Sequence, residues 1–305
     1  MLRDVTAVRY VTPLHTGGSV PGIVEADDLG TYVVKFTGSG QGRKALVAEV
    51  IVGELARRLG LRVPELVRAH FDPAVARDEP HQEVRDLLDA SPGLNLGMDF
   101  LPGAVDFTPH ALDVDPLEAG RIVWLDALTA NVDRTVHSSN LLIWPAFGTR
   151  EPRLWLIDHG AALVFHHRWE TAAASVDKVY DFRRHALGGG GQAPDTVAAD
   201  ADLAPRVTRD LLREITALVP DAWLTGEPGF TGPDEVRDAY VTYLAARAEA
   251  SALWLPTDFP GRDQLAAEDA DRAAATEASR PDWLKRVPDL HGKPAAEQDW
   301  TAHLG

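Results

Sequence analysis

Three side chains with oxygen ligands, Asp133, Asn140 and Asp158, stand beside apolar runs of the sequence. Asp133 and Asn140 precede the run "LLIW", and Asp158 follows the run "RLWLI". Carboxylate and carboxamide oxygens suit a hard cation such as Mg²⁺, which shares one or two carboxylates with phosphate oxygens. We therefore interpret Asn140 and Asp158 as metal ligands. Asp133 is then available to accept a proton from, or to orient, an attacking hydroxyl.

Each of these residues also has an ordinary structural explanation. Asp133 can cap a turn and pair with the adjacent Arg134, Asn140 can be a turn residue, and residues 158–160 can form a hairpin connection. The functional interpretation therefore depends on whether the rest of the chain supplies groups for the same chemistry.

Lys35 is such a group. It ends the run "TYVVK", where strand alternation puts it on the face of Val33 and opposite Val34. An ammonium buried without a partner is costly. Glu49, in the helix predicted to follow, is the expected partner of Lys35.

The stretch "HTGGSVPG" brings Gly17, Gly18 and Ser19 close together just before the second strand. It is either a plain flexible turn or a loop whose backbone amides hold phosphates. A glycine-rich loop, a strand lysine, a helix glutamate, a loop Asp with a later Asn, and a second Asp before Gly are together the parts needed for phosphoryl transfer.

The elements that must position these groups follow from residue patterns. Val- and Thr-rich runs separated by turn residues predict a small antiparallel sheet over residues 4–14, 22–28 and 31–36, and a further strand near 94–101. Helical spacing, with start and stop signals, predicts helices over 44–60, 115–131, 204–220 and 232–255. Residues 187–194, "LGGGGQAP", read as a mobile loop.

The composition limits the classes of partner. The chain has 305 residues, 45% of them hydrophobic, and a net charge of −16, which opposes a nucleic acid partner. It contains no cysteine, so a disulfide framework and a thiolate metal site are excluded. We find no secretory signal and no apolar run that could span a membrane, and we expect a cytoplasmic protein with no membrane partner.

These features in this order resemble the HipA-like kinases, within the protein-kinase-like and phosphoinositide-kinase-like superfamily. "TGGSVPGIV" resembles the phosphate-covering loop, "YVVKF" the lysine strand and "GMDFLPG" the hinge. "NVDRTVHSSNLL" resembles the catalytic loop, and "LIDHGAAL" stands where kinases carry Asp-Phe-Gly. The resemblance covers about residues 12–250.

The resemblance implies an α+β, bilobal protein-kinase-like fold. Residues 1–98 would form a small N-terminal lobe with an antiparallel sheet and one helix, and 99–103 the hinge. Residues 104–262 would form a mainly helical C-terminal lobe, and 263–305 an Ala-rich acidic extension.

The resemblance also implies roles for single residues, with ATP and Mg²⁺ as cofactors. Asp133 is the catalytic base or orienting group, and Asn140 and Asp158 bind the metal. Lys35 contacts the phosphates and is paired with Glu49. The remaining nucleotide contacts are Val33 and Leu142 around adenine, the hinge residues Asp99, Phe100 and Leu101, and the loop amides of Gly17, Gly18 and Ser19.

Two departures from the kinase pattern are visible. Asp133 and Asn140 are seven positions apart, where kinases have five. We expect the extra residues to bulge at Thr135, Val136 and His137. His159 also replaces the usual Phe after the metal-binding Asp.

The predicted function is ATP- and Mg²⁺-dependent phosphoryl transfer, with Ser or Thr hydroxyls of a protein as the acceptor that the family implies. One alternative is a small molecule or a biosynthetic peptide as acceptor on the same fold, and another is a nucleotide-binding pseudokinase scaffold. We expect helices within 204–255 to build the acceptor side of the cleft.

Overall fold

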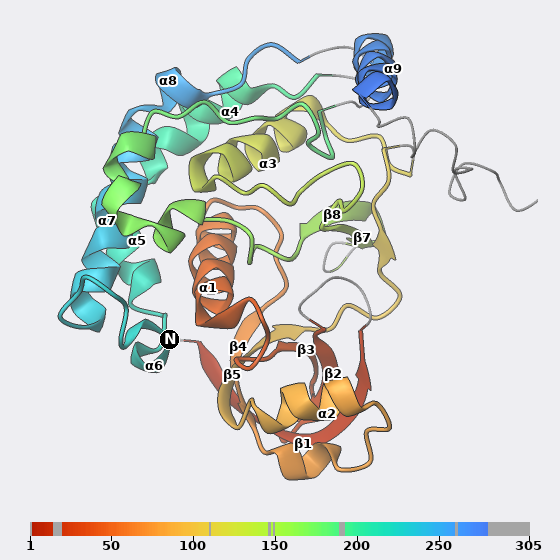
Figure 1. Cartoon of the computed structure of the whole chain (residues 1–305), viewed down its shortest axis with the longest axis vertical. Coiled ribbons are helices and arrows are strands. Elements are labelled where there is room, and N and C mark those ends of the chain that lie inside the picture. The colour runs from red at the N-terminus through yellow and green to blue at the C-terminus, as the bar shows by residue number, and fades with distance from the viewer. Residues whose placement is uncertain are drawn as a thin grey trace, which may run out of the picture. The chain divides into compact units, whose positions relative to one another are not determined.

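Five strands of the N-terminal region close into a barrel (Figure 1). The computed structural model describes residues 2–14, 20–109, 111–145, 148, 150–188, 193–259 and 262–279. The barrel strands, in the order β1-β2-β3-β5-β4 around it, are β1 (Arg3–Pro13), β2 (Gly22–Ala26), β3 (Thr31–Lys35), β4 (Leu66–Phe71) and β5 (Gly93–Asp99).

The sheet is mixed, so the prediction of a purely antiparallel sheet is wrong at one pairing. β1 and β4 run parallel, with Arg3 opposite Val67 and Thr6 opposite His70. The segment that forms β4 was not predicted as a strand. Its pairing with β1 closes the barrel and leaves neither strand as an open edge, which protects the backbone from pairing with other chains.

Alternation along β3 separates the barrel interior from the site. Val34 and Tyr32 point into the barrel, where they pack with apolar residues of the other strands and are almost fully buried. Val33 and Lys35 therefore share the opposite face, as the sequence predicted. Two short helical segments cover this core from outside: the 3₁₀ helix Pro73–Ala76, and α2 (Gln82–Asp89), a second N-terminal helix where only one was predicted.

Helix α1 (Gly42–Arg58) connects the barrel to the helices that follow. Its residues 45–56 are all buried, which is unusual for a surface helix and requires partners on several sides. It packs against α5 (Arg209–Thr216) and α6 (Asp221–Leu224). Its apolar residues belong to the same core as those of α3 (Pro116–Thr129) rather than to the barrel core. Glu49 is thereby fixed between the two parts of the fold.

Helix α3 (Pro116–Thr129) has the start that the sequence predicted. The side chain of Asp115 accepts hydrogen bonds from the backbone N–H groups of Leu117 (3.0 Å) and Glu118 (3.1 Å), and Pro116 occupies the first turn. The helix ends at Ala130 in the left-handed conformation (φ +51°), which redirects the chain into the segment 131–140.

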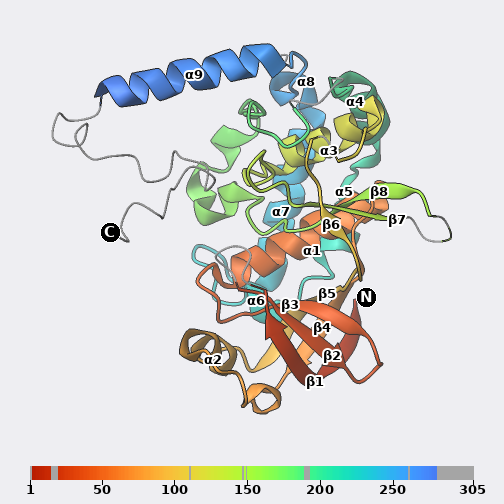
Figure 2. The same ribbon diagram turned by 90° about the vertical axis from the view of Figure 1, so that its right-hand side faces the viewer.

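A second sheet follows α3. It has the order β6-β7-β8, formed by β6 (Val105–Asp106), β7 (Leu141–Pro145) and β8 (Pro152–Leu156), and Figure 2 shows it beside the barrel. β7 and β8 pair antiparallel from Leu141 opposite Leu156 onward. The residues that precede β7 and those that follow β8 therefore lie at the same edge.

The two remaining predicted helices, 204–220 and 232–255, are each divided into shorter elements. The segment 204–220 divides into a 3₁₀ turn, Ala204–Arg206, and α5 (Arg209–Thr216), because Thr208 caps a new helix by accepting from the N–H of Leu211. The other helices of this part are α4 (Thr196–Leu203), α6 (Asp221–Leu224), α7 (Pro233–Glu249) and α8 (Ser251–Trp254). Three 3₁₀ turns, at Val164–His167, Trp169–Thr171 and Ala173–Ser175, follow β8.

The chain divides into two compact units, Met1–Phe259 and Pro260–Gly305. The first contains every element described so far, and the second contains α9 (Arg262–Ser279). Among the helices that the structure describes, none has both the length and the apolar character to cross a membrane. The predicted loop at 187–194 falls partly on residues 189–192, which lie outside the described residues.

Gly120 gives the first testable prediction. A Cβ at this position of α3 would lie 2.2 Å from the backbone oxygen of Asp195, the residue that caps α4. We expect Gly120→Ala to lower the free energy of unfolding by about 1–3 kcal/mol, although Ala usually stabilises a helix interior. Urea unfolding measures this.

Gly40→Ala is the control for this substitution, because a Cβ there meets nothing within 4 Å. We expect its effect to stay within about 0.5 kcal/mol. Gly120→Ala as stable as the wild type would show that the close approach of α3 and α4 is absent.

Candidate active site

Lys35 joins three segments that are distant in sequence. Its Nζ donates hydrogen bonds to Oε1 of Glu49 on α1 and to Oδ1 of Asp158 after β8, the latter at 2.7 Å. The Lys35 and Glu49 side chains are 9% and 0% exposed, whereas that of Asp158 is 38% exposed. The predicted partner of Lys35 is in place, and Asp158, predicted as a metal ligand, is a second partner.

Charge is unevenly balanced in this cluster, because two carboxylates share one ammonium. Burial alone lowers the pKa of Lys35, but the charges of Glu49 and Asp158 outweigh it, so this pKa lies above its usual value. Burial raises the pKa of Glu49, and Lys35 offsets only part of the effect. For Asp158, burial is outweighed by Lys35, and the pKa is lowered.

Gly160 makes room for this cluster. A Cβ at this position would lie 3.2 Å from Oε1 of Glu49 and 3.4 Å from Cβ of Ala45. The glycine of "IDHG" therefore lets the loop after β8 approach α1 closely. A larger residue would separate Asp158 from the Lys35–Glu49 pair.

A cavity of about 260 Å³ adjoins the cluster. The predicted nucleotide and metal residues that line it are Val33, Lys35, Asp99, Phe100, Leu101, Leu142 and Asp158. Met98, Pro64 and Ile157 also line it and were not predicted. Met98 is paired with Val33 across β3 and β5, so the pairing of these strands supplies part of the wall.

Asp133 and Asn140 lie in contact despite the long spacing between them. Nδ2 of Asn140 donates to the backbone oxygen of Asp133 (3.1 Å) and to its Oδ2 (3.2 Å). Oδ1 of Asn140 accepts from the hydroxyl of Ser138 at 3.1 Å. The backbone oxygen of Asn140 accepts from the N–H of Ile157 at 3.1 Å, which brings Asn140 beside the segment of Asp158.

The extra residues of the loop form a closed turn, at the position predicted for a bulge. The N–H of Thr135 donates to the oxygen of Ser138 (2.8 Å), and the N–H of Val136 donates to the oxygen of Arg184 (2.9 Å). Thr135 and His185 form an antiparallel bridge. The extra residues thus pair with Arg184 and His185, which are distant in the chain, and the closed turn brings Asn140 back to Asp133.

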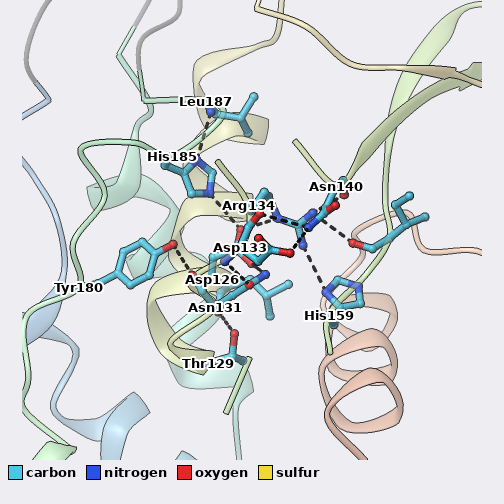
Figure 3. Close-up of polar contacts among 12 residues, drawn as sticks. Asp126, Thr129, Asn131, Asp133, Arg134, Asn140, His159, Tyr180, His185 and Leu187 are labelled. Atoms are coloured by element: carbon cyan, nitrogen blue, oxygen red, sulfur yellow. Dashed lines mark hydrogen bonds and ion pairs between the residues drawn. The ribbon is translucent and has the colours of Figure 1, made fainter. Parts of the chain in front are cut away.

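Arg134 links the loop of Asp133 and Asn140 to the loop of Asp158 (Figure 3). It is 1% exposed, and its Nε donates to Oδ2 of Asp126 at 2.6 Å. Its Nη1 donates to the backbone oxygens of Asn140 and, at 3.4 Å, Ile157. The interpretation that Arg134 pairs with its neighbour Asp133 is therefore wrong, because the guanidinium turns inward to a buried carboxylate and leaves Asp133 exposed.

Asp126 is the anion at the centre of this network. Besides Arg134, it accepts from Nδ2 of Asn131 (2.9 Å) and from Nε2 of His185 (3.0 Å). Its burial would raise its pKa, but the charge of Arg134 and the bond from His185 lower it well below the usual value. Asn131 in turn accepts from the N–H of Asp133 at 3.1 Å, so the network extends to the exposed carboxylate.

The sequence analysis missed Asp126, Asn131, Arg134 and His185 as functional residues. Their types gave no direct signal, because Asp126 lies inside a helix and His185 is far along the chain. The one available signal was that "NVDR" carries an Asn and an Arg on either side of Asp133.

His159 is neutral and of defined tautomer. Burial and the neighbouring Arg134 lower its pKa to about 3. Since Nη2 of Arg134 can only donate, Nδ1 of His159 accepts this bond (3.2 Å) and the proton resides on Nε2. The imidazole therefore takes the place of the expected Phe as a buried group that also accepts from Arg134.

Backbone strain is concentrated in residues 130–140 and 158–163, the two segments that carry Asp133 and Asp158. Of six described non-glycine residues with positive φ, four lie here: Ala130 (+51°), Asn140 (+47°), Asp158 (+54°) and Leu163 (+57°). Such residues cost on the order of 1 kcal/mol or more each and persist where surrounding contacts fix them. Strain at both predicted metal ligands fits a constraint imposed by function.

The ligand set fits a divalent cation. Asn140 and Asp158 each offer a side-chain oxygen ligand and come from adjacent segments, and Mg²⁺ needs few protein ligands when phosphate oxygens supply others. The cluster of Glu49, Asp158 and Lys35 also has a surplus of negative charge. Within the described residues there is no group of three His, Asp or Glu side chains that could hold a metal alone. Gly17, Gly18 and Ser19 lie outside the described residues.

Comparisons with known proteins agree with this geometry. A family described as HipA-like kinase matches residues 8–257. The crystal structure of the proinflammatory kinase CtkA of Helicobacter pylori has a TM-score of 0.51 and 12% identity, covering 90% of this chain and 99% of that one. At this identity the likeness shows the fold alone, which is kinase-like.

Two structures of the Golgi casein kinase also match. The one with Mn/ADP bound has a TM-score of 0.48 and 13% identity, covering 83% of this chain and 73% of that one. The other has a TM-score of 0.42 and 11% identity, covering 85% and 77%. No curated protein matches the chain.

Removal of Arg134 alone is expected to be more harmful than removal of the whole ion pair. Arg134→Met leaves Asp126 buried with its main partner missing, and we expect a loss of about 3–5 kcal/mol in the free energy of unfolding. Adding Asp126→Asn should recover part of this loss. Arg153→Met, which breaks an exposed pair with Glu151, is the control and should cost less than about 1 kcal/mol. Additive effects of the two core substitutions would contradict the pairing.

Acid should destabilise the protein through His159. Its folded pKa of about 3 lies below the usual histidine pKa of 6.5, so between these values the unfolded chain binds more protons. The free energy of unfolding should therefore fall as pH drops from 7 toward 4, by up to about 1.4 kcal/mol per pH unit from this group. In His159→Asn, which keeps an acceptor for Arg134, this part of the slope should disappear.

Denaturant unfolding at several pH values measures the slope. His70→Asn replaces an exposed histidine and serves as the control, which should keep the wild-type slope. Parallel profiles for the wild type and His159→Asn between pH 7 and 4 would disprove the buried neutral state.

Proposed function

Because this chain belongs to the HipA-like kinase family and is a kinase, we propose that it transfers the γ-phosphoryl group of ATP, with Mg²⁺, to a Ser or Thr hydroxyl of a protein. The observation that carries the proposal is the contact of Lys35 with both Glu49 and Asp158 at the edge of a cavity. In this proposal residues 1–98 and 104–262 act as two lobes joined by a hinge at 99–103.

The cavity is the proposed adenine site. Val33 and Leu142 come from different sheets and both line it, so a flat ring between them is covered on two sides. The backbone hydrogen bonds of residues 99–101 indicate which N–H group is available to adenine. The N–H of Asp99 already donates to Glu65 and that of Phe100 to Thr31, at 2.8 and 3.0 Å. In the described part of the chain the N–H of Leu101 has no partner, and it is the donor we assign to adenine.

Lys35 is the proposed phosphate contact. Its ammonium is fixed by two carboxylates, so it keeps its charge and its position without rearrangement when a polyanion binds. Asn140 and Asp158 would hold Mg²⁺, which would supply positive charge to the phosphate oxygens.

Asp133 is the proposed catalytic residue. Its Oδ2 accepts from Asn140, and its Oδ1 has no partner among the described residues, so Oδ1 is left for the acceptor hydroxyl. As the acceptor oxygen bonds to the γ-phosphorus, the bond from the γ-phosphorus to the bridging oxygen of ADP breaks. The hydroxyl proton passes to Asp133, and ADP leaves with the bonding electrons.

Two carboxylate substitutions should separate chemistry from nucleotide binding. Asp133→Asn should lower phosphoryl transfer about 10²–10⁴-fold and leave the rise in Tm with Mg-ATP unchanged. Asp158→Asn should lose both transfer and the Mg²⁺-dependent part of the Tm rise. Transfer is measured with γ-³²P-ATP against a cell lysate and by autophosphorylation.

Asp113→Asn, at an exposed carboxylate that lines no described cavity, is the control and should behave as the wild type. If the wild type binds Mg-ATP but transfers phosphate to no acceptor, the pseudokinase scaffold is the correct interpretation. Full transfer by Asp133→Asn would remove Asp133 from the mechanism.

A further inference from the structure

A second cavity, of about 650 Å³, lies beside the loop of Asp133. Its lining includes Val132 and Arg134, the two neighbours of Asp133, and also Thr135. Most of the rest comes from residues 164–185, and only Tyr243 and Arg247 come from the helices predicted to build the acceptor side. The helices predicted to build the acceptor side therefore contribute little to the lining of this cavity.

The wall is attached to the loop of Asp133 by backbone bonds. Val136 donates to the oxygen of Arg184, the N–H of Ala186 donates to the oxygen of Arg134 at 3.1 Å, and Thr135 bridges His185. The extra residues of the catalytic loop thus fix the segment 184–186 relative to Asp133. Groups on this wall keep a defined position with respect to the hydroxyl that Asp133 receives.

The exposed charges of the lining are mainly positive. Arg168, Lys178 and Arg184 are exposed there, against one exposed carboxylate, Asp181. His167 has a lowered pKa, through burial and Lys44, and is neutral at pH 7. The lining also contains buried side chains that are already engaged: Arg134 and His185 with Asp126, and Arg247 with backbone oxygens.

This surplus of exposed positive charge in the lining is unexpected in a chain with a net charge of −16. Elsewhere exposed cations are commonly paired with carboxylates, as in Arg9–Glu25, Arg58–Glu214 and Arg213–Asp210. Within the described residues neither Arg168 nor Lys178 makes an ion pair. Unpaired cations beside the acceptor position complement an anionic partner.

The lining also exposes apolar side chains. Val132, Val164 and Val179 are 62%, 41% and 65% exposed, so the cavity is open to solvent rather than closed around a small ligand. Exposed apolar side chains gathered beside a site are typical of a surface that a partner covers. A closed pocket, which encloses most of a small ligand, lacks such exposure.

We propose that the wall formed by residues 164–185 binds the acceptor as an extended peptide, with Asp or Glu residues near the phosphorylated Ser or Thr. Arg168 and Lys178 bind the carboxylates, and the exposed valines pack against apolar side chains of the same peptide. The inference rests on the proposed function and specifies its substrate class.

A positional-scanning peptide library with a fixed central Ser or Thr tests the proposal. With γ-³²P-ATP, the wild type should select Asp and Glu over Gln and Lys at one or more flanking positions, by about tenfold in kcat/KM. The Arg168→Glu/Lys178→Glu double variant should lose or reverse this selection, mainly through KM. Raising the salt concentration should also weaken it in the wild type, because exposed charges are screened.

Arg77→Glu reverses one charge at an exposed residue that lines neither cavity, half the charge change of the double variant, and it should keep the wild-type selection. The melting temperature of each variant checks that it is folded. A wild type with no acidic selection, or an unchanged selection in the double variant, would overturn the proposal.

The Tm rise with Mg-ATP separates this proposal from the function on which it rests. If the wild type binds Mg-ATP and labels lysate proteins but labels no library peptide, the peptide substrate class is wrong and the kinase function stands. If it binds Mg-ATP and labels only small anionic metabolites, the substrate class is again wrong. Absence of Mg-ATP binding would overturn both.

Discussion

The geometry of the site depends on one buried cation, the guanidinium of Arg134. It is anchored by Asp126 inside α3 and donates to the backbone of both loops that carry the predicted catalytic and metal-binding residues. A buried guanidinium is tolerated only when its charge and its donors are satisfied, so its partners cannot move independently. The positions of Asn140 and of the segment before Asp158 therefore follow from where α3 places Asp126.

The same arrangement explains the strained backbone. Asn140 and Asp158 both adopt left-handed conformations, which are uncommon for residues other than glycine. Arg134 binds the oxygen of Asn140, and Lys35 binds the carboxylate of Asp158, so strong polar contacts oppose the relaxation of each residue. The stability of the surrounding core thus offsets the strain at Asn140 and Asp158 and holds both side chains in place.

The two cavities lie beside side chains of opposite charge, and we assign a different ligand to each. The smaller one adjoins carboxylates in excess over Lys35, which suits a nucleotide accompanied by a divalent cation. The larger one carries exposed cations and valines, which suits an acidic peptide. Val132 lines the larger cavity, and its neighbour Asp133 accepts a hydrogen bond from Asn140, the residue that we propose as a metal ligand. A protein with a strongly negative net charge thus keeps a local positive surface next to its acceptor position.

The sequence by itself determined which residues share one face of a strand or helix, because strand alternation and helix spacing are local properties. Val33 and Lys35 fall on one face of β3 for that reason, and Asp115 caps α3 as its pattern predicts. The tertiary structure alone decided what Arg134 binds and how the seven-residue spacing is accommodated. Arg134 is anchored by Asp126, eight positions away on α3, and also donates to His159, whereas the long spacing is accommodated by contacts with residues 184–186. Contacts of this kind leave no periodic signal in the sequence.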